Sequence, residues 1–353
     1  MYAVKKFVSA TVALLMAASL AACQTSEPAA SETSSASSEA ASSAAEPASS
    51  SEESSPASGE TYEVGLIQLM DHTSLNQIRD SLMAELDALG YGDRINMDYQ
   101  NAQGEQTNLN SISQKFAGDQ KDLIISIATP AALSAAAAAP DIPQVFSAVT
   151  DPVSVKLVEN LDAPEGNITG TSDAIPVDQV FTLMQKLTPD VKTVGFVYNL
   201  GEPNSVSVIE QAKAYLEANG FSYVEATVTN VGEVQQAAQS LVGKCEAFYT
   251  PIDNTVASAM AIYADVARQA GIPIYTGADS MVIDGGFATV GIDYTLLGKQ
   301  TAAMVVKVLE GTPISEIPVE TLTNFATVVN TTTAADIGVT IPDDVLSSAI
   351  VVE

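Results

Sequence analysis

An internal repeat constrains the fold of this chain more than any other feature of its sequence. Gly65 in "YEVGLIQL" and Gly195 in "KTVGFVYN" are separated by 130 positions, and each lies in a short apolar run. The same interval relates two further pairs of landmarks, Gly90 with Gly220 and Pro143 with Pro273. Three pairs at one spacing indicate that a single structural unit occurs twice in the chain.

Each copy alternates short apolar runs with longer amphipathic segments. In chain order these predict a strand, a helix, a strand, a helix, a strand, a helix and a strand. Gly90 and Gly220 each follow a helical pattern and precede an aromatic residue, which is typical of a glycine that ends a helix in the left-handed conformation. We therefore expect an α/β fold with two doubly wound parallel-sheet lobes.

The segment after the second copy predicts how the lobes are joined. Residues 291–312 predict a linker and a helix, residues 317–322 a strand, and residues 325–342 a strand with a terminal turn. An extra helix and strand fit a chain that returns to the first lobe and then crosses again to the second. We expect three hinge crossings, with lobe 1 formed by residues 61–173 and 292–322 and lobe 2 by residues 174–291 and 323–353.

The N-terminal segment has the pattern of a secretory signal. Lys5 and Lys6 precede an uncharged stretch, and Leu-Ala-Ala stands directly before Cys23. The stretch is shorter than the roughly 20 residues of a membrane-spanning helix. Residues 1–22 therefore predict a lipoprotein signal peptide, and the L-A-A-C motif predicts lipidation of Cys23. An ordinary cleaved signal with an incidental cysteine is the alternative.

Residues 23–60 predict a disordered tether. After Cys23 they consist of small, polar and acidic residues, with no apolar side chain larger than alanine. Such a segment cannot bury enough apolar area to offset the entropy of ordering it. With the lipid on Cys23, it would hold the globular part at the cell membrane, on the extracytoplasmic face.

Charge and motif content exclude several functions. The formal net charge of −29 argues against binding to nucleic acid. Apart from Cys23 the chain has one cysteine, Cys245, and it has one histidine, so we expect no disulfide, no metal site and no cofactor. Signatures of nucleophilic hydrolases, P-loops and dinucleotide sites are missing from the sequence. We expect a protein that is not an enzyme; a hydrolase that uses Asp253 or Asp279 is the alternative.

Hydroxyl residues end two neighbouring strands of lobe 1. Thr129 precedes Pro130, a residue suited to the first helical position. We expect Thr129 to be the helix N-cap and to form an anion site with the free N–H groups of the first turn. Thr150 closes the next strand, in "AVTDPVS". Each of these threonines alone fits an ordinary helix cap or turn. Two of them at the same edge of one sheet favour a binding site for a carboxylate.

Lobe 2 offers a negative charge opposite this site. Asp253, in "TPIDNTV", stands where the repeat places Thr129 in lobe 1. We expect Asp253 to bind an ammonium group. A ligand held in a cleft between the lobes, by the carboxylate site of lobe 1 and by Asp253, would then be a zwitterion. Asn204 and Ser205 begin the helix after the first strand of this lobe, either as ligand contacts or as caps. Asp279 could assist or could be an ordinary helix cap.

Beyond these single residues, the chain contains the motifs "YQNAQGEQTNLNSISQKF", "IATPAA", "VFSAVTDPV", "NITGTSD", "VGFVYNLGEPNS", "DNTV", "VGIDYTLLGKQTA" and "IPVET". Together these motifs resemble the TrpX-type substrate-binding lipoproteins of ABC transporters. The resemblance implies a type I periplasmic-binding-protein fold, no catalysis, and an aromatic amino acid (tryptophan, tyrosine or phenylalanine) as ligand. It implies an ABC permease and its ATPase as partners, and we expect a monomer. By motif, ligand contacts fall on Thr129, Pro130, Thr150, Asn204, Ser205, Asp253 and Asn254.

The first loop of lobe 1 departs from the family pattern. Relatives carry His-Pro-Ala-Leu-Asp after the first strand, whereas this chain has "HTSLNQ" and keeps only His72 and Leu75. That loop is expected to line the side-chain pocket, with Gln68, His72 and Leu75 as contacts. A ligand-sensing receptor for a membrane signalling partner, and a binder of a different small zwitterionic solute, are the alternatives.

Overall fold

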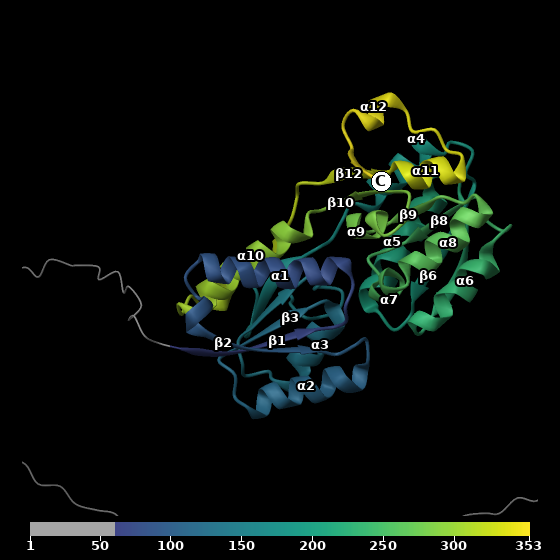
Figure 1. The fold of residues 1–353 in the computed structure, drawn as a ribbon. Coiled ribbons are helices and arrows are strands. Elements are labelled where there is room, and N and C mark those ends of the chain that lie inside the picture. The colour runs from purple at the N-terminus through teal and green to yellow at the C-terminus, as the bar shows by residue number, and fades with distance from the viewer. Residues whose placement is uncertain (1–60) are drawn as a thin grey trace, which may run out of the picture. The chain divides into compact units, whose positions relative to one another are not determined.

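The computed structural model describes residues 61–353, so the expected signal peptide, Cys23 and the expected tether lie outside the described residues. The first sheet has the strand order β11-β5-β4-β3-β1-β2, with all pairs parallel (Figure 1). Its strands are β1 (Tyr62–Gln68), β2 (Ile95–Asn101), β3 (Leu123–Ile127), β4 (Gln144–Ser147), β5 (Ile168–Ser172) and β11 (Glu320–Thr321).

The second sheet has the order β13-β12-β10-β9-β8-β6-β7. Its strands are β6 (Thr193–Asn199), β7 (Ser222–Val228), β8 (Ala247–Thr250), β9 (Ile274–Thr276), β10 (Ala288–Gly291), β12 (Ala326–Asn330) and β13 (Ile350–Val352). The pair β10 and β12 is antiparallel and the other pairs are parallel. The order β4-β3-β1-β2 in the first sheet recurs as β9-β8-β6-β7 in the second, which confirms the predicted repeat.

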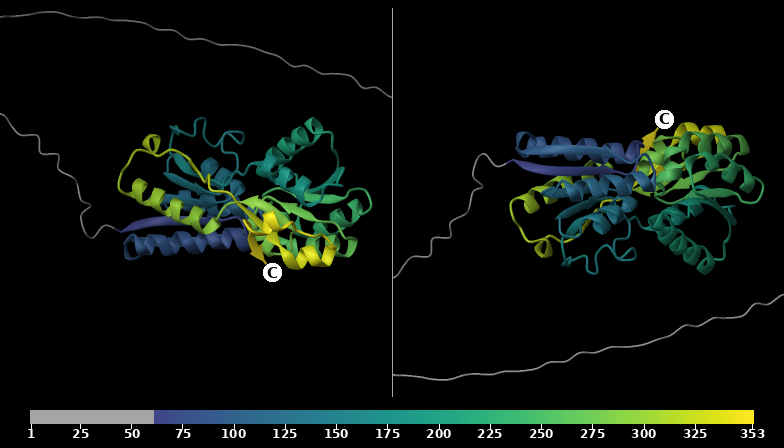
Figure 2. Two further views of the ribbon diagram at one scale, coloured as in Figure 1. Left: turned by 90° about the horizontal axis from the view of Figure 1, so that it is seen from above. Right: turned by 90° about the horizontal axis from the view of Figure 1, so that it is seen from below.

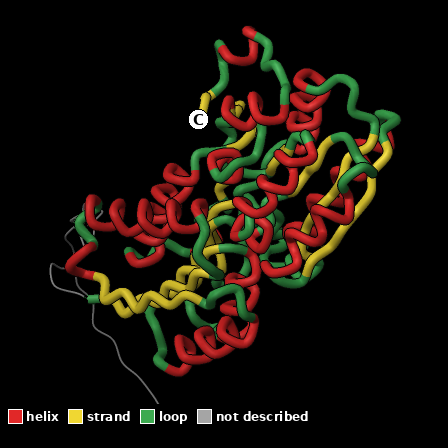
Figure 3. The backbone as a smooth tube through the Cα atoms, turned by 45° about the vertical axis from the view of Figure 1, so that its right-hand side comes forward, coloured by secondary structure: helices red, strands yellow, loops and turns green. Residues whose placement is uncertain are grey.

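Helices lie on both faces of each sheet (Figure 2, Figure 3). Those of lobe 1 are α1 (Thr73–Ala88), α2 (Gln106–Gly118), α3 (Thr129–Ala138) and α10 (Tyr294–Leu309). Those of lobe 2 are α4 (Val177–Leu187), α5 (Pro203–Ala218), α6 (Val234–Leu241), α7 (Asn254–Ser258), α8 (Met260–Ala270), α9 (Asp279–Ile283), α11 (Thr331–Ile337) and α12 (Asp343–Leu346). In lobe 1, α1 packs against α10 and α2 against α3. Within residues 61–353, no helix has the length and apolar character needed to cross a membrane.

The paired glycines of the repeat serve close packing. A Cβ on Gly65 would lie 2.6 Å from the ring of Phe116 in α2, and one on Gly195 would lie 2.6 Å from Sγ of Cys245. A larger residue at either position would push the neighbouring helix or loop off the sheet. The helix-ending pair, Gly90 and Gly220, has φ of +83° and +77°, so both adopt the predicted left-handed conformation.

The chain passes between the sheets three times. The crossings lie between β5 and α4, between β10 and α10, and between β11 and β12. Two doubly wound lobes joined by three hinge crossings are therefore confirmed. They bring the carboxyl ends of the parallel strands of both sheets to the boundary between the lobes.

The C-terminal segment was predicted less well. The strand expected over residues 317–322 is only the two-residue β11. Where a terminal turn was expected, α11 forms instead, because Asn330 caps its start and Gly338 ends it with φ of +73°. Asn330 Oδ1 accepts from the backbone N of Thr333 at 2.8 Å. The chain then continues through α12 to β13, a strand that pairs with β12.

Candidate functional site

Hydrogen bonds join the two lobes at the ends of their strands. On one side, Thr73 Oγ1 donates to Asp284 Oδ2 at 2.8 Å, and the hydroxyls of Ser74 and Ser280 are in hydrogen-bond contact. On the other side, Ser207 Oγ of α5 donates to Asp151 Oδ2, in the loop after β4, at 2.7 Å. Hydrogen bonds from α1 and from the loop after β4 therefore tie lobe 1 to lobe 2.

A cavity of about 300 Å³ opens between the lobes. Pro130 at the start of α3 contributes to its wall from lobe 1, and Asn199 and Glu202 contribute from lobe 2. Strand-end residues from both sheets thus share one space, as open α/β sheets predict.

Thr129 lies at this boundary, but not as the predicted N-cap. The cap position belongs to Ala128, whose φ of +82° turns the chain one residue earlier, so Thr129 is the first residue of α3. Its side chain is buried, and Oγ1 has no hydrogen-bond partner. Pro130 occupies the first turn of α3, where N–H groups are free of intrahelical partners. The predicted set of donors is present, although the capping geometry was wrong.

The ends of β4 and β5 add a second hydroxyl and a carboxylate. Thr150 follows β4, and its carbonyl accepts from Ser172 Oγ at 3.1 Å. Asp173, directly after β5, is 1% exposed; its Oδ2 accepts from Tyr294 OH at 3.3 Å, and its Oδ1 has no partner. Burial raises the pKa of Asp173 to about 6, while the hydroxyls of Thr150 and Tyr294 act against this rise.

Sequence reasoning missed Asp173. The signal was available in "NITGTSD", an acidic residue at the end of an apolar run, which is the same pattern that singled out Thr129 and Thr150. It was read only as part of a family motif and as a lobe boundary.

Asp253 lies at the end of β8 as predicted, but its carboxylate is fully engaged within lobe 2. Oδ2 accepts from the backbone N of Asn199 at 2.7 Å, and Oδ1 accepts from the backbone N of Val256 at 2.9 Å. Asp253 is thereby the N-cap of α7. Burial and the nearby Glu202 raise its pKa to about 7. Both carboxylate oxygens of Asp253 therefore already accept a hydrogen bond within lobe 2.

Glu202 is the second acidic residue that the sequence did not reveal. It is 4% exposed, and its carboxylate accepts from the backbone N of Asn254 (3.0 Å) and the backbone N of Thr255 (2.9 Å). It also accepts from Asn254 Nδ2 at 2.5 Å and from Thr255 Oγ1 at 2.8 Å. Glu202 therefore ties the loop after β6 to the start of α7. The only hint in the sequence is an acid directly before the helix-starting Pro203.

Asn204, Ser205 and Asn254 line the lobe 2 side. Asn204 is 2% exposed; its Nδ2 donates to the carbonyl of Ile252 at 2.7 Å, while its Oδ1 has no partner. Ser205 is fully buried and hydrogen bonds to Asp253. Asn254 Oδ1 lies 3.0 Å from His72 Nε2 of lobe 1. Asn204 Oδ1 is thus an acceptor of lobe 2 that has no partner.

The predicted residues of the first loop divide into two groups. His72 is half-buried and contacts lobe 2 through Asn254, and burial lowers its pKa. Leu75 of α1 is buried at the boundary. Gln68 does not join them: its Nε2 donates to the carbonyl of Met70 (2.7 Å) and to Asn76 Oδ1 (2.8 Å), inside lobe 1. Gln68 shapes the loop, and the prediction that it contacts ligand is not supported by this geometry.

Asp279 begins α9 and is not its N-cap, which is Ala278. Oδ1 of Asp279 accepts from the backbone N of Ser280 at 2.7 Å. Burial, with a smaller contribution from the charge of Asp293, raises its pKa to about 6.

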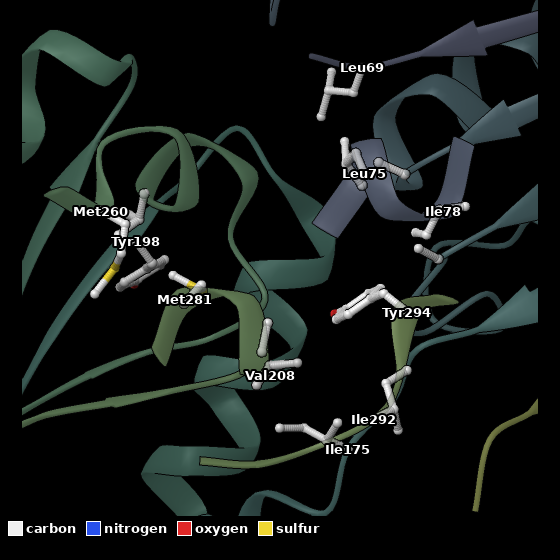
Figure 4. Close-up of a cluster of buried hydrophobic side chains, with 14 of the residues drawn as sticks. Leu69, Leu75, Ile78, Ile175, Tyr198, Val208, Met260, Met281, Ile292 and Tyr294 are labelled. Atoms are coloured by element: carbon white, nitrogen blue, oxygen red, sulfur yellow. The ribbon is translucent and has the colours of Figure 1, made fainter. Parts of the chain in front are cut away.

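Apolar side chains from both lobes and the crossings gather beside these polar groups. Figure 4 shows Leu75 and Ile78 of α1 on one side and Tyr198, Met260 and Met281 of lobe 2 on the other. Ile175 and Ile292 come from the crossings, and Tyr294 is the first residue of α10 (Figure 4). An apolar wall beside a few unpaired polar atoms is the usual make-up of a small-molecule site.

The described part of the chain holds no group of three or more His, Cys, Asp or Glu residues that could bind a metal ion. Cys245 is buried beside Gly195, away from the residues just described, and burial raises the pKa of its thiol to about 11. A thiol with a raised pKa is a poor nucleophile. The arrangement can hold a small polar molecule between the lobes.

Comparison with known proteins gives a consistent result. The sequence profile of the family described as ABC transporter substrate binding protein matches residues 63–353. A tyrosine-binding protein from Clostridioides difficile (strain R20291) is 40% identical over 269 residues, which cover 76% of this chain and 78% of that protein.

Two solved structures differ in how closely they match. A domain from Streptococcus pneumonia in complex with L-Trp is 36% identical, with a TM-score of 0.81, over 83% of this chain and 100% of the other. The second structure is the ligand-free, open form of a substrate-binding protein with adhesive properties from Clostridium difficile. It is 38% identical, with a TM-score of 0.64, over 83% of this chain and 99% of the other. At nearly equal identity, this chain superposes better on the structure of the complex than on the ligand-free, open structure.

Proposed function

Since this chain belongs to the family of ABC transporter substrate-binding proteins, which bind their ligands without catalysis, we propose that it binds an aromatic amino acid between its lobes and delivers it to an ABC permease. The observation that carries the proposal is that each lobe has a buried polar atom without a partner in the segment after a strand, Thr129 Oγ1 in lobe 1 and Asn204 Oδ1 in lobe 2. Buried polar atoms of this kind normally have partners, so their occurrence at strand ends marks a place for a polar ligand.

The carboxylate of the ligand is assigned to lobe 1. Thr129 Oγ1 is a neutral donor, and the first turn of α3 supplies free N–H groups and the positive end of the helix dipole. These groups together suit an anion at a helix N-terminus. Thr150, at the neighbouring strand end, borders the same site.

The side chain of the ligand is assigned to the apolar cluster. Leu75, Ile78 and Met281 offer aliphatic and thioether surface, and methionine adapts well to the faces and edges of aromatic rings. This preference supports an aromatic side chain, and relatives that bind tyrosine and L-Trp support it as well. Tyrosine, tryptophan and phenylalanine are the candidates.

The anchor completes the proposal. Lipidated Cys23 and the tether through residue 60 would keep the protein at the extracytoplasmic face of the membrane, within reach of the permease and its ATPase. Support comes from the lipobox pattern and the composition of the tether.

Calorimetry with the twenty amino acids tests the proposal. We expect saturable, equimolar binding of at least one aromatic amino acid, and a loss of about 1–2 kcal/mol in its binding free energy in Thr129→Val, because one neutral donor to the carboxylate is removed. Thr182→Val is the matched control: the Thr182 hydroxyl is exposed on α4 and donates to the carbonyl of Asp178 at 2.8 Å, so its removal should leave affinity unchanged. Binding of none of the amino acids would refute the proposal.

A further inference from the structure

We infer that Asp173, and not Asp253, pairs with the α-ammonium group of the ligand. The inference rests on the proposed function and names the residue that makes the site select an amino acid. It begins from position. Asp173 follows β5, Thr150 follows β4, and Thr129 follows β3, and these three strands are neighbours in the order β5-β4-β3.

The spacing of these strands fits the length of an amino-acid backbone. Strands in a sheet lie about 4.8 Å apart, so the ends of β3 and β5 are separated by roughly 9.5 Å. Two hydrogen bonds of about 2.9 Å each, one at either end, leave a gap of about 4 Å. That gap is close to the distance between the nitrogen and the far carboxylate oxygen of an α-amino acid. A ligand with its carboxylate at Thr129 therefore places its ammonium at Asp173.

The surroundings of Asp173 lack a cation. None of the ion pairs within residues 61–353 involves it, and the hydroxyl of Tyr294 is the partner of its Oδ2. Its Oδ1 is buried with no partner at all. A buried carboxylate without a counter-charge is costly, and a ligand ammonium would remove that cost. Burial also raises the pKa of Asp173 to about 6, so the group is mostly ionised at neutral pH and ready to pair.

The other acidic groups of the boundary are less suitable. Asp253 accepts from two backbone N–H groups, and Glu202 accepts from four donors. Asp279 is partly exposed and accepts from the backbone N of Ser280. Asp173 is the acidic residue at the boundary whose carboxylate combines nearly complete burial with a free oxygen.

Binding measurements with matched ligands test the inference. L-Tyrosine is compared with 3-(4-hydroxyphenyl)propanoate, which has the same ring and carboxylate but no ammonium. In wild type we expect L-tyrosine to bind at least about 30-fold more tightly than the analogue. In Asp173→Asn this preference should fall to within about threefold, while Asp279→Asn, which removes a partly exposed carboxylate of similar pKa, should retain it.

The outcomes separate the inference from the proposed function. Wild type that binds no aromatic amino acid overturns the proposed function. If wild type binds L-tyrosine and Asp173→Asn keeps the full preference for L-tyrosine over the analogue, the inference alone is overturned. If Asp173→Asn does not fold by circular dichroism, the crystal structure of the wild-type complex decides: the ligand nitrogen is expected about 3 Å from Asp173 Oδ1. A nitrogen bound at Asp253 or Asp279 instead would contradict the inference.

Discussion

His72 Nε2 and Asn254 Oδ1 lie 3.0 Å apart across the boundary between the lobes. The orientation of Asn254 is fixed by Glu202, which accepts from its Nδ2, so the amide oxygen must face His72. His72 Nε2 is consequently the donor, and the neutral imidazole carries its proton there. One buried glutamate thus sets the geometry of a contact that joins two lobes.

Replacement of Glu202 by glutamine should destabilise lobe 2. An amide in place of the carboxylate would direct its own N–H groups at the donors of Asn254 or Thr255. We expect a loss of about 1–3 kcal/mol in the free energy of unfolding, because buried donors are left unpaired. Part of this loss is offset, because removal of the Glu202 charge relieves its repulsion of Asp253 and lowers the pKa of Asp253.

Urea denaturation of the purified protein measures this loss. Glu210→Gln, on the exposed face of α5, the helix that directly follows Glu202, is the matched control; Glu210 pairs with Lys213, and its replacement should change stability by less than about 0.5 kcal/mol. Equal stability of the Glu202→Gln protein and this control would show that Glu202 does not organise the loop.

Ligand affinity should weaken as the pH falls below about 6.5. Asp173, with a pKa raised to about 6, becomes protonated in that window and can no longer pair with ammonium. His72 acts in the same direction. Burial lowers the pKa of His72 below its ordinary value of about 6.5, so the neutral imidazole that contacts Asn254 is fully present above that value. The contact is lost as the pH falls through the lowered pKa. Affinity should be nearly constant between about pH 7 and 8.5.

Titration calorimetry at several pH values checks this dependence. The groups that face Asp173 are Thr150 and Tyr294, and the pKa of Tyr294 is raised well above its ordinary value, so it stays neutral throughout. Asp279 also titrates near pH 6. The decrease should therefore persist in Asp279→Asn; its disappearance in that variant would assign the effect to Asp279 instead.

The fold was largely predictable because its signals are local. Apolar runs, helix-ending glycines and a 130-residue interval each follow from the chain itself, and they gave two lobes and three crossings. The C-terminal helix α11 was missed because three threonines begin it, and a run of β-branched residues disfavours a helix unless a cap such as Asn330 starts it.

The boundary between the lobes was predictable in position, but the hydrogen bonds along it were not. Strand ends were correctly identified as the boundary, since sheet topology fixes where they meet. Which carboxylate is free was not predictable, because that depends on hydrogen bonds between residues far apart in sequence. Asp253 and Glu202 are consumed by such contacts, and Asp173 is not. A buried group is available to a ligand only when the rest of the fold leaves it unpaired.

Identification of the small molecule that stays with the purified protein tests the central claim most directly. The protein is purified without added ligand and denatured, and the released small molecules are measured by mass spectrometry. We predict tyrosine, tryptophan or phenylalanine in an amount that approaches one per protein molecule. A sugar or another solute without an α-amino acid group, released in that amount, would contradict the account.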